Sequence, residues 1–135
     1  MRSVEGLSKS LVQTWNIPAK YVIGHSDVAP DRKQDPGERF DWQRLAAAGV
    51  GIMPGEKQLS PGAAAQRPAG KPERFVACRD LLGAVGYDGV SKVSSDKELE
   101  CYIMTFQRHW LPTHLSGLAD DETLARLAIV AGMMV

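Results

Sequence analysis

The sequence predicts a small α/β unit followed by an all-α bundle of three helices. Apolar residues recur at helical spacing near the N-terminus, and a short β-branched and aromatic run follows them. Three more helical patterns lie within residues 73–135. Residues 55–72 separate the two parts and are rich in Gly, Ala and Pro. This composition predicts a linker between units 1–54 and 73–135, with a long surface loop as the alternative.

The first unit begins with an amphipathic pattern. One helical face carries Val4, Leu7, Leu11, Val12 and Trp15. The pattern predicts a helix over residues 3–15, which Pro18 ends. The run Tyr-Val-Ile-Gly at 21–24 predicts a buried strand. His25 would then lie where a strand passes into a loop, a common position for catalytic groups.

A loop and a second helix complete the first unit. Residues 26–40 contain three Asp and two Pro and show no apolar period, which predicts a loop. Asp41 is the expected N-cap of a helix through Trp42, Leu45 and Ala46, closed by Gly49.

The second unit contains three helical patterns. The first has an apolar face of Phe75, Cys78, Leu82 and Val85 and stops at Gly86. The second lies between Asp96 and Pro112 and carries Leu99, Tyr102, Ile103, Phe106 and Trp110. The third carries Leu124, Leu127, Ala128 and Ala131, with Asp120 or Asp121 as its cap. Three short helices predict a small bundle near the lower size limit for a self-sufficient core.

The overall composition excludes several classes of function. Sixteen basic and sixteen acidic residues cancel, so no strong field is expected to attract nucleic acid or an anionic membrane. No apolar run approaches the ~20 residues needed to span a bilayer, and residues 1–20 lack a secretory signal. Cys78 and Cys101 are the only cysteines, and we expect both to be small buried hydrophobic residues rather than a disulfide.

His25, Lys33 and Asp35 suggest a zinc site for hydrolysis. Such a site uses three protein ligands and leaves one position for water. His25 and Asp35 could supply two ligands, and Lys33 lies two residues before Asp35, on the same side of an extended segment. Its ammonium could stabilise a developing oxyanion. On spacing alone, a hydrogen-bonded loop pair of His25 and Asp35 stays the alternative.

A family resemblance bears on that choice. The segment VIGHSDVAPDRKQDPGERFDWQRLAAAGVGIMPG closely resembles the C-terminal part of the zinc-dependent N-acetylmuramoyl-L-alanine amidases of the AmpD/AmiD kind, which are related to peptidoglycan recognition proteins. The resemblance implies that His25 and Asp35 bind zinc and that Lys33 assists catalysis. Further matches are Phe40, Trp42, Arg44, Leu45, Ala46, Gly49, Gly51 and Pro54. It also implies a mixed sheet flanked by helices, incomplete in these residues.

Two parts of the family pattern have no match here. The family has another zinc histidine and a catalytic glutamate upstream of the matching segment. No histidine precedes His25, and Glu5 is the sole glutamate before it, on the predicted helix. His109 and His114 match nothing in the amidase pattern. We therefore expect the first ligand and the general base to come from sequence outside these residues.

The second unit resembles the peptidoglycan-binding domain that follows the amidase domain in many of these enzymes. The matching stretches are RDLLGAVGYD, IMTFQRHW and SGLADDETLARL. The resemblance implies that Tyr87, Gln107 and Arg108 could contact glycan or peptide, with solvated surface residues as an equal alternative.

The sequence thus predicts a Zn²⁺-dependent N-acetylmuramoyl-L-alanine amidase with a wall-binding module. Its partners would be peptidoglycan or muropeptides, and not nucleic acid. The alternative function is an inert peptidoglycan-binding protein that carries an amidase remnant. The wall-binding module favours the cell envelope or periplasm, although the lack of an export signal leaves the cytoplasm open.

Overall fold

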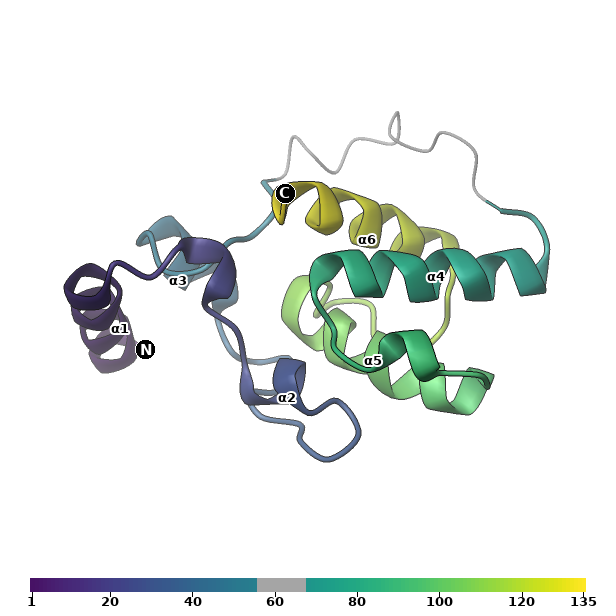
Figure 1. Ribbon diagram of the computed structural model, residues 1–135. Coiled ribbons are helices and arrows are strands. Elements are labelled where there is room, and N and C mark those ends of the chain that lie inside the picture. The colour runs from purple at the N-terminus through teal and green to yellow at the C-terminus, as the bar shows by residue number, and fades with distance from the viewer. Residues whose placement is uncertain (56–67) are drawn as a thin grey trace.

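The computed structural model describes residues 1–55 and 68–135. Most of the predicted linker, 56–67, lies outside the described residues. The helices are α1 (Arg2–Trp15), α2 (His25–Val28), α3 (Trp42–Ala47), α4 (Lys71–Val85), α5 (Asp96–Trp110) and α6 (Asp121–Met133), with 3-10 turns η1 (Ala19–Tyr21) and η4 (Val90–Lys92). Figure 1 shows α1 at the edge of the molecule farthest from the bundle of α4, α5 and α6.

The predicted α/β class is wrong, because the described residues contain helices and no strand. Neither the strand expected at 21–24 nor the mixed sheet is present there. The amide of Tyr21 donates to the carbonyl of Pro18 at 2.9 Å, and that of Val22 donates to Ala19 at 3.1 Å. These local bonds form η1. A strand needs a partner for its backbone groups, and β-propensity alone cannot supply one.

The predicted N-terminal helix is present as α1. It ends at Asn16, which adopts the left-handed conformation (φ 49°), and Pro18 follows two residues later. No residue of α1 is buried, and Leu7, Leu11 and Trp15 are exposed. The amphipathic pattern therefore identified the helix, but most of its apolar face is uncovered in the described structure.

The second predicted helix is present as α3. Its N-cap is Asp41, whose carboxylate accepts from the amide of Arg44 at 3.0 Å, as expected. Trp42, Leu45 and Val50 form a small buried cluster. Met53 packs against this cluster and also against the core of the bundle. The first unit therefore shares a packing residue with the second.

The three predicted C-terminal helices form one bundle. α4 and α6 run side by side, and α5 packs against both (Figure 1). The bundle core includes Leu82, Phe106, Trp110, Leu127 and Val130. Gly86 ends α4 in the left-handed region (φ 118°), where a side chain would be strained. Asp120 caps α6 by accepting from the amide of Thr123 at 3.0 Å, as expected.

The two cysteines differ. Cys78 is buried, and burial, followed by the nearby charge of Asp120, raises the pKa of its thiol to about 12. Cys101 is exposed on α5, so the prediction that it is buried is wrong. Both are free thiols.

Among the helices of the described residues, none combines the length and apolar character that crossing a membrane requires.

Candidate metal site

His25 and Asp35 are brought together at the start of α2. His25 is the first residue of that helix, and its Nδ1 lies 3.0 Å from Oδ2 of Asp35. The amide of Ser26 also donates to the carbonyl of Asp35 at 2.8 Å, which holds the two segments together. Both side chains are open to solvent, with 54% and 68% of their surface exposed. The helix α2 itself was not predicted, since four residues carry no apolar period.

The pair suits a divalent metal only as part of a larger ligand set. Imidazole nitrogen and carboxylate oxygen are both zinc ligands, and two ligands of a tetrahedral zinc ion lie roughly 3.3 Å apart. The 3.0 Å separation of Nδ1 and Oδ2 is close to that spacing. Across the described residues, however, no group of three or more His, Cys, Asp or Glu side chains could hold a metal ion. The geometry therefore fits two ligands of a metal site, and the described residues supply no third one.

Lys33 acts on the same carboxylate. The hydrogen bond with His25 lowers the pKa of Asp35 and outweighs the opposing effect of desolvation, and the charges of His25 and, last, Lys33 make smaller contributions that also lower it. Lys33 is exposed, and its amide donates to the carbonyl of Ala29 at 2.9 Å in the turn after α2. The structure therefore places the imidazole at the start of α2 beside the carboxylate of Asp35, and Lys33 lies in the loop that leads to that carboxylate.

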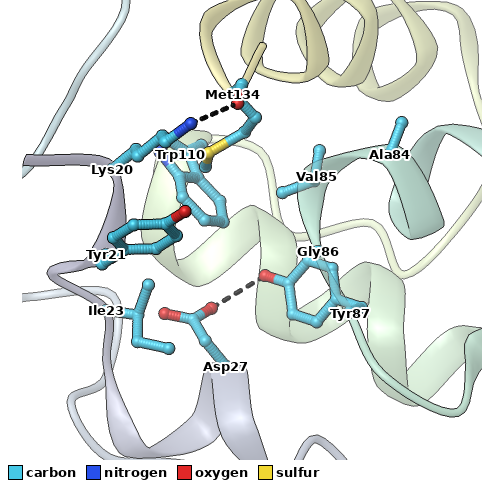
Figure 2. A pocket seen from close by; sticks show the side chains of 10 residues that line it. All are labelled: Lys20, Tyr21, Ile23, Asp27, Ala84, Val85, Gly86, Tyr87, Trp110 and Met134. Atoms are coloured by element: carbon cyan, nitrogen blue, oxygen red, sulfur yellow. Dashed lines mark hydrogen bonds between the residues drawn. The ribbon is translucent and has the colours of Figure 1, made fainter. Parts of the chain in front are cut away.

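A buried aspartate lies two residues beyond His25. The carboxylate of Asp27 accepts three hydrogen bonds: from the amide of Gly24 at 2.8 Å, from the hydroxyl of Tyr87 at 2.7 Å and from Nδ1 of His109 at 2.7 Å. Only about one twentieth of the Asp27 and His109 side chains is exposed (5% and 4%). Figure 2 shows Asp27 and Tyr87 pointing toward each other in the lining of a cavity, joined by this hydrogen bond.

The partners of Asp27 are themselves fixed by aromatic packing. The ring of His109 lies between Trp42, at 3.8 Å, and Trp110, at 3.6 Å between centroids. Tyr87 makes edge contacts with Tyr102 and Trp110. The sequence offers no local signal for this cluster, because its members are 60 and 82 positions from Asp27. The only indication is that His109 immediately precedes Trp110 on the second predicted helix of the bundle.

The three residues predicted to contact wall fragments occupy different environments. Tyr87 is buried and donates to Asp27. Gln107 is fully buried; its amide nitrogen bonds to Ser116 at 3.0 Å and Thr123 at 2.8 Å, and its oxygen accepts from Gly117. Arg108 is partly exposed, with Nε 4.0 Å from a carboxylate oxygen of Glu38. For Tyr87 and Gln107, ligand contact would compete with bonds inside the protein.

A cavity of about 480 Å³ lies where the first unit meets the bundle. Its lining includes Tyr21 and Ile23 from the first unit and Val85 and Trp110 from the bundle (Figure 2). At its edge, Nζ of Lys20 donates to the carbonyl of Met134 at 3.1 Å. The two units therefore meet around this cavity through two polar contacts, Lys20 with Met134 and Asp27 with Tyr87.

Comparisons with known proteins identify the relatives of this chain. No family model matches it. It is 37% identical over 119 residues to N-acetylmuramoyl-L-alanine amidase AmiD of Escherichia coli K12, which covers 88% of this chain and 42% of AmiD. It is 42% identical over 44 residues to 1,6-anhydro-N-acetylmuramyl-L-alanine amidase AmpD of the same organism, covering 33% of this chain and 24% of AmpD.

The fold has a matching relative among solved structures. The complex of E. coli AmiD with anhydro-N-acetylmuramic acid-L-Ala-D-γ-Glu-L-Lys superposes with a TM-score of 0.84 at 32% identity, over 98% of this chain and 51% of that one. The chain thus spans about half the length of that structure. It spans less than half the length of each of the two curated relatives. The sequence and the fold together establish that the chain is homologous to part of the N-acetylmuramoyl-L-alanine amidases AmiD and AmpD.

Proposed function

We propose that this chain forms part of a zinc-dependent N-acetylmuramoyl-L-alanine amidase that acts on peptidoglycan or muropeptides. The reaction is hydrolysis of the amide between the lactyl group of N-acetylmuramic acid and L-alanine. The observation that carries the proposal is the match to AmiD over most of this chain, within which His25 and Asp35 lie side by side. The anhydromuramyl peptide bound to AmiD supports the substrate class.

Within this proposal each residue has a role. His25 and Asp35 would hold zinc, and a bound zinc ion would polarise the scissile carbonyl and activate water. The lowered pKa of Asp35 keeps its carboxylate ionised, which a metal ligand requires. The ammonium of Lys33 would stabilise negative charge on the carbonyl oxygen in the transition state. The remaining ligand and a proton-transferring glutamate would come from outside the described residues.

We further propose that residues 73–135 bind the wall and that residues 55–72 link the units. The relation to peptidoglycan recognition proteins and the envelope location belong to the same proposal. Arg108, whose side chain is partly exposed, is a more accessible contact than Tyr87 or Gln107, which are buried and hydrogen-bonded inside the protein.

A direct assay tests the catalytic proposal. The chain, and a version extended upstream in the reading frame, would be incubated with anhydro-N-acetylmuramic acid-L-Ala-D-γ-Glu-L-Lys and zinc. Mass spectrometry would follow release of the peptide. We expect release by the extended version that is abolished by His25→Ala. If the extended version supplies a third ligand and still releases no peptide, the catalytic proposal is wrong.

One observation favours a second candidate, an inert wall-binding protein. The described residues hold no three-donor metal group. Co-sedimentation with insoluble peptidoglycan separates the candidates, since an inert binder would sediment with the wall while neither the chain nor its extended version releases peptide.

A further inference from the structure

Asp27 connects the backbone beside His25 to the C-terminal bundle. Its Oδ2 accepts from the amide of Gly24, the residue directly before His25, and also from Nδ1 of His109 on α5. Its Oδ1 accepts from the hydroxyl of Tyr87, which follows α4. A single buried carboxylate therefore joins the start of α2 to two separate segments of the bundle.

The start of α2 also touches the loop that carries Asp35. A Cβ atom added to Gly24 would lie 2.7 Å from Cδ of Pro36, so the proline ring packs against Gly24 more closely than a residue with a side chain would allow. The amide of Ser26 donates to the carbonyl of Asp35. A movement of the Gly24 backbone would therefore alter both halves of the His25–Asp35 pair.

The donors to Asp27 have little freedom to move. Two tryptophan rings hold the ring of His109 on both sides. Burial, followed by the charge and hydrogen bond of Asp27, raises the pKa of Tyr87 well above its ordinary value, so its hydroxyl keeps its proton and donates. A buried carboxylate that lost one of these donors would bear a desolvation cost without compensation, which opposes its displacement.

We infer that Asp27, held by Tyr87 and His109, is a positioning residue for His25, so that the C-terminal bundle forms part of the support of the metal site. The inference rests on the proposed role of His25 as a ligand. It gives the bundle a second task beside the proposed wall binding. Asp27 would act through the backbone amide that precedes His25. Groups beyond the metal ligands fix ligand orientation, and their loss weakens metal binding.

The test compares Tyr87→Phe with Tyr102→Phe in the full chain. The first change removes the hydroxyl that donates to Asp27 and keeps the ring. The second removes a hydroxyl of the same unit that lies 3.4 Å from the carbonyl of Asp88. Nuclear magnetic resonance would record the ring signals of His25 without metal, assigned among the three histidines with His25→Gln. We expect the His25 signals to move in Tyr87→Phe and to stay in place in Tyr102→Phe.

A stability control separates positioning from general weakening. Val130 is fully buried in α6 and is not a hydrogen-bond partner of Asp27, so Val130→Ala lowers stability without removing a donor to that carboxylate. If Val130→Ala moves the His25 signals as much as Tyr87→Phe does, or if Tyr87→Phe leaves them unchanged, the inference is overturned. Asp27→Asn repeats the measurement from the carboxylate side, with movement of the His25 signals again expected.

Zinc titration followed on the same signals adds a second readout. We expect Tyr87→Phe to weaken zinc binding at His25 by about tenfold, the lower end of the range for outer-shell groups, and Tyr102→Phe to leave it unchanged. Equal affinities in the two variants would count against the inference. If zinc fails to bind at His25 even in an upstream-extended wild type, the proposed metal function fails, whereas the metal-free signals still decide whether Asp27 positions His25.

Discussion

Nδ1 of His109 lies 2.7 Å from Oδ2 of Asp27, 82 positions earlier in the chain. Both side chains are buried, so this contact lies inside the interface between the first unit and the bundle, which we call the junction. Two independent modules on a linker would not need such a contact. The junction therefore contributes to the stability of the folded chain, and its disruption should lower the free energy of unfolding.

Replacing His109 with Leu should destabilise the folded chain. The change leaves the buried Asp27 carboxylate short of one donor and removes a stacked ring, and an unsatisfied buried group costs about 1–3 kcal/mol. Urea unfolding followed by circular dichroism measures this loss. His114→Leu is the matched control, because His114 bonds to Asp120 in a partly exposed position and should cost less. Equal losses in both variants would contradict the assigned importance of the junction.

Asp35→Ala and Lys33→Ala should fail differently in an upstream-extended, active form. Loss of Asp35 should remove zinc, and activity with it. Loss of Lys33 should leave zinc and KM nearly unchanged and lower kcat by about 10²–10³, as for a single oxyanion donor. Elemental analysis and kinetics on a muramyl peptide measure both. A Lys33→Ala protein that loses its zinc would show that the lysine organises the loop instead.

The start of α6 should be most stable in mildly acidic solution. Burial raises the pKa of Asp120, but hydrogen bonds from Ser116, Thr123 and His114 outweigh it and lower the pKa to about 2. The contribution of the ionised Asp120 to folding stability is present above pH 3.8 and is lost as the pH falls toward 2. The hydrogen bond with Asp120 raises the pKa of His114. The contribution of the charged His114 to folding stability is therefore complete below pH 6.5 and is lost as the pH rises through the raised value.

Thermal unfolding between pH 2 and 9 checks this window, with both contributions present from about pH 4 to 6.5. His114→Gln should abolish the part of the decline above pH 6.5 that depends on its charge and leave the acid side in place. An unchanged alkaline decline in His114→Gln would exclude His114 as its source.

Limited proteolysis should cut between Gly55 and Pro72, where Gly, Ala and Pro predominate. The C-terminal fragment should resist further digestion longer than the N-terminal one, because its helices share the larger buried core. The two fragments should co-elute from a sizing column, since Asp27 bonds to Tyr87 and His109 across the cut. Fragments that separate at once would contradict a stable junction, and an uncut segment would contradict the linker.

Local signals predicted the helices well. Asp41 and Asp120 cap α3 and α6, and Gly86 ends α4, because a cap depends on the few residues around it. The strand at 21–24 was predicted from residue type alone and is wrong, because a strand also depends on a neighbour that sequence composition does not reveal.

The candidate site divides in the same way. His25, Lys33 and Asp35 lie within one segment and take their expected roles from its resemblance to the amidase family, and the first and last of these are in contact. The sequence pattern places Asp27 in a loop and gives it no role, and His109 matches nothing in the amidase pattern. Their partnership depends on how the two units pack, which no periodicity within either unit encodes. The bonds of Tyr87 and Gln107 inside the protein escaped prediction for the same reason.

The three tryptophans divide the molecule into separately visible regions. Trp15 on α1 is 73% exposed, whereas Trp42 and Trp110 are buried on either side of His109. Acrylamide should therefore quench one long-wavelength emitter and spare the other two. Because the imidazole of His109 lies against both buried indoles, opening of the junction should change their emission. Tryptophan fluorescence can therefore monitor the junction through Trp42 and Trp110, and the exposed Trp15 on α1 serves as the internal reference.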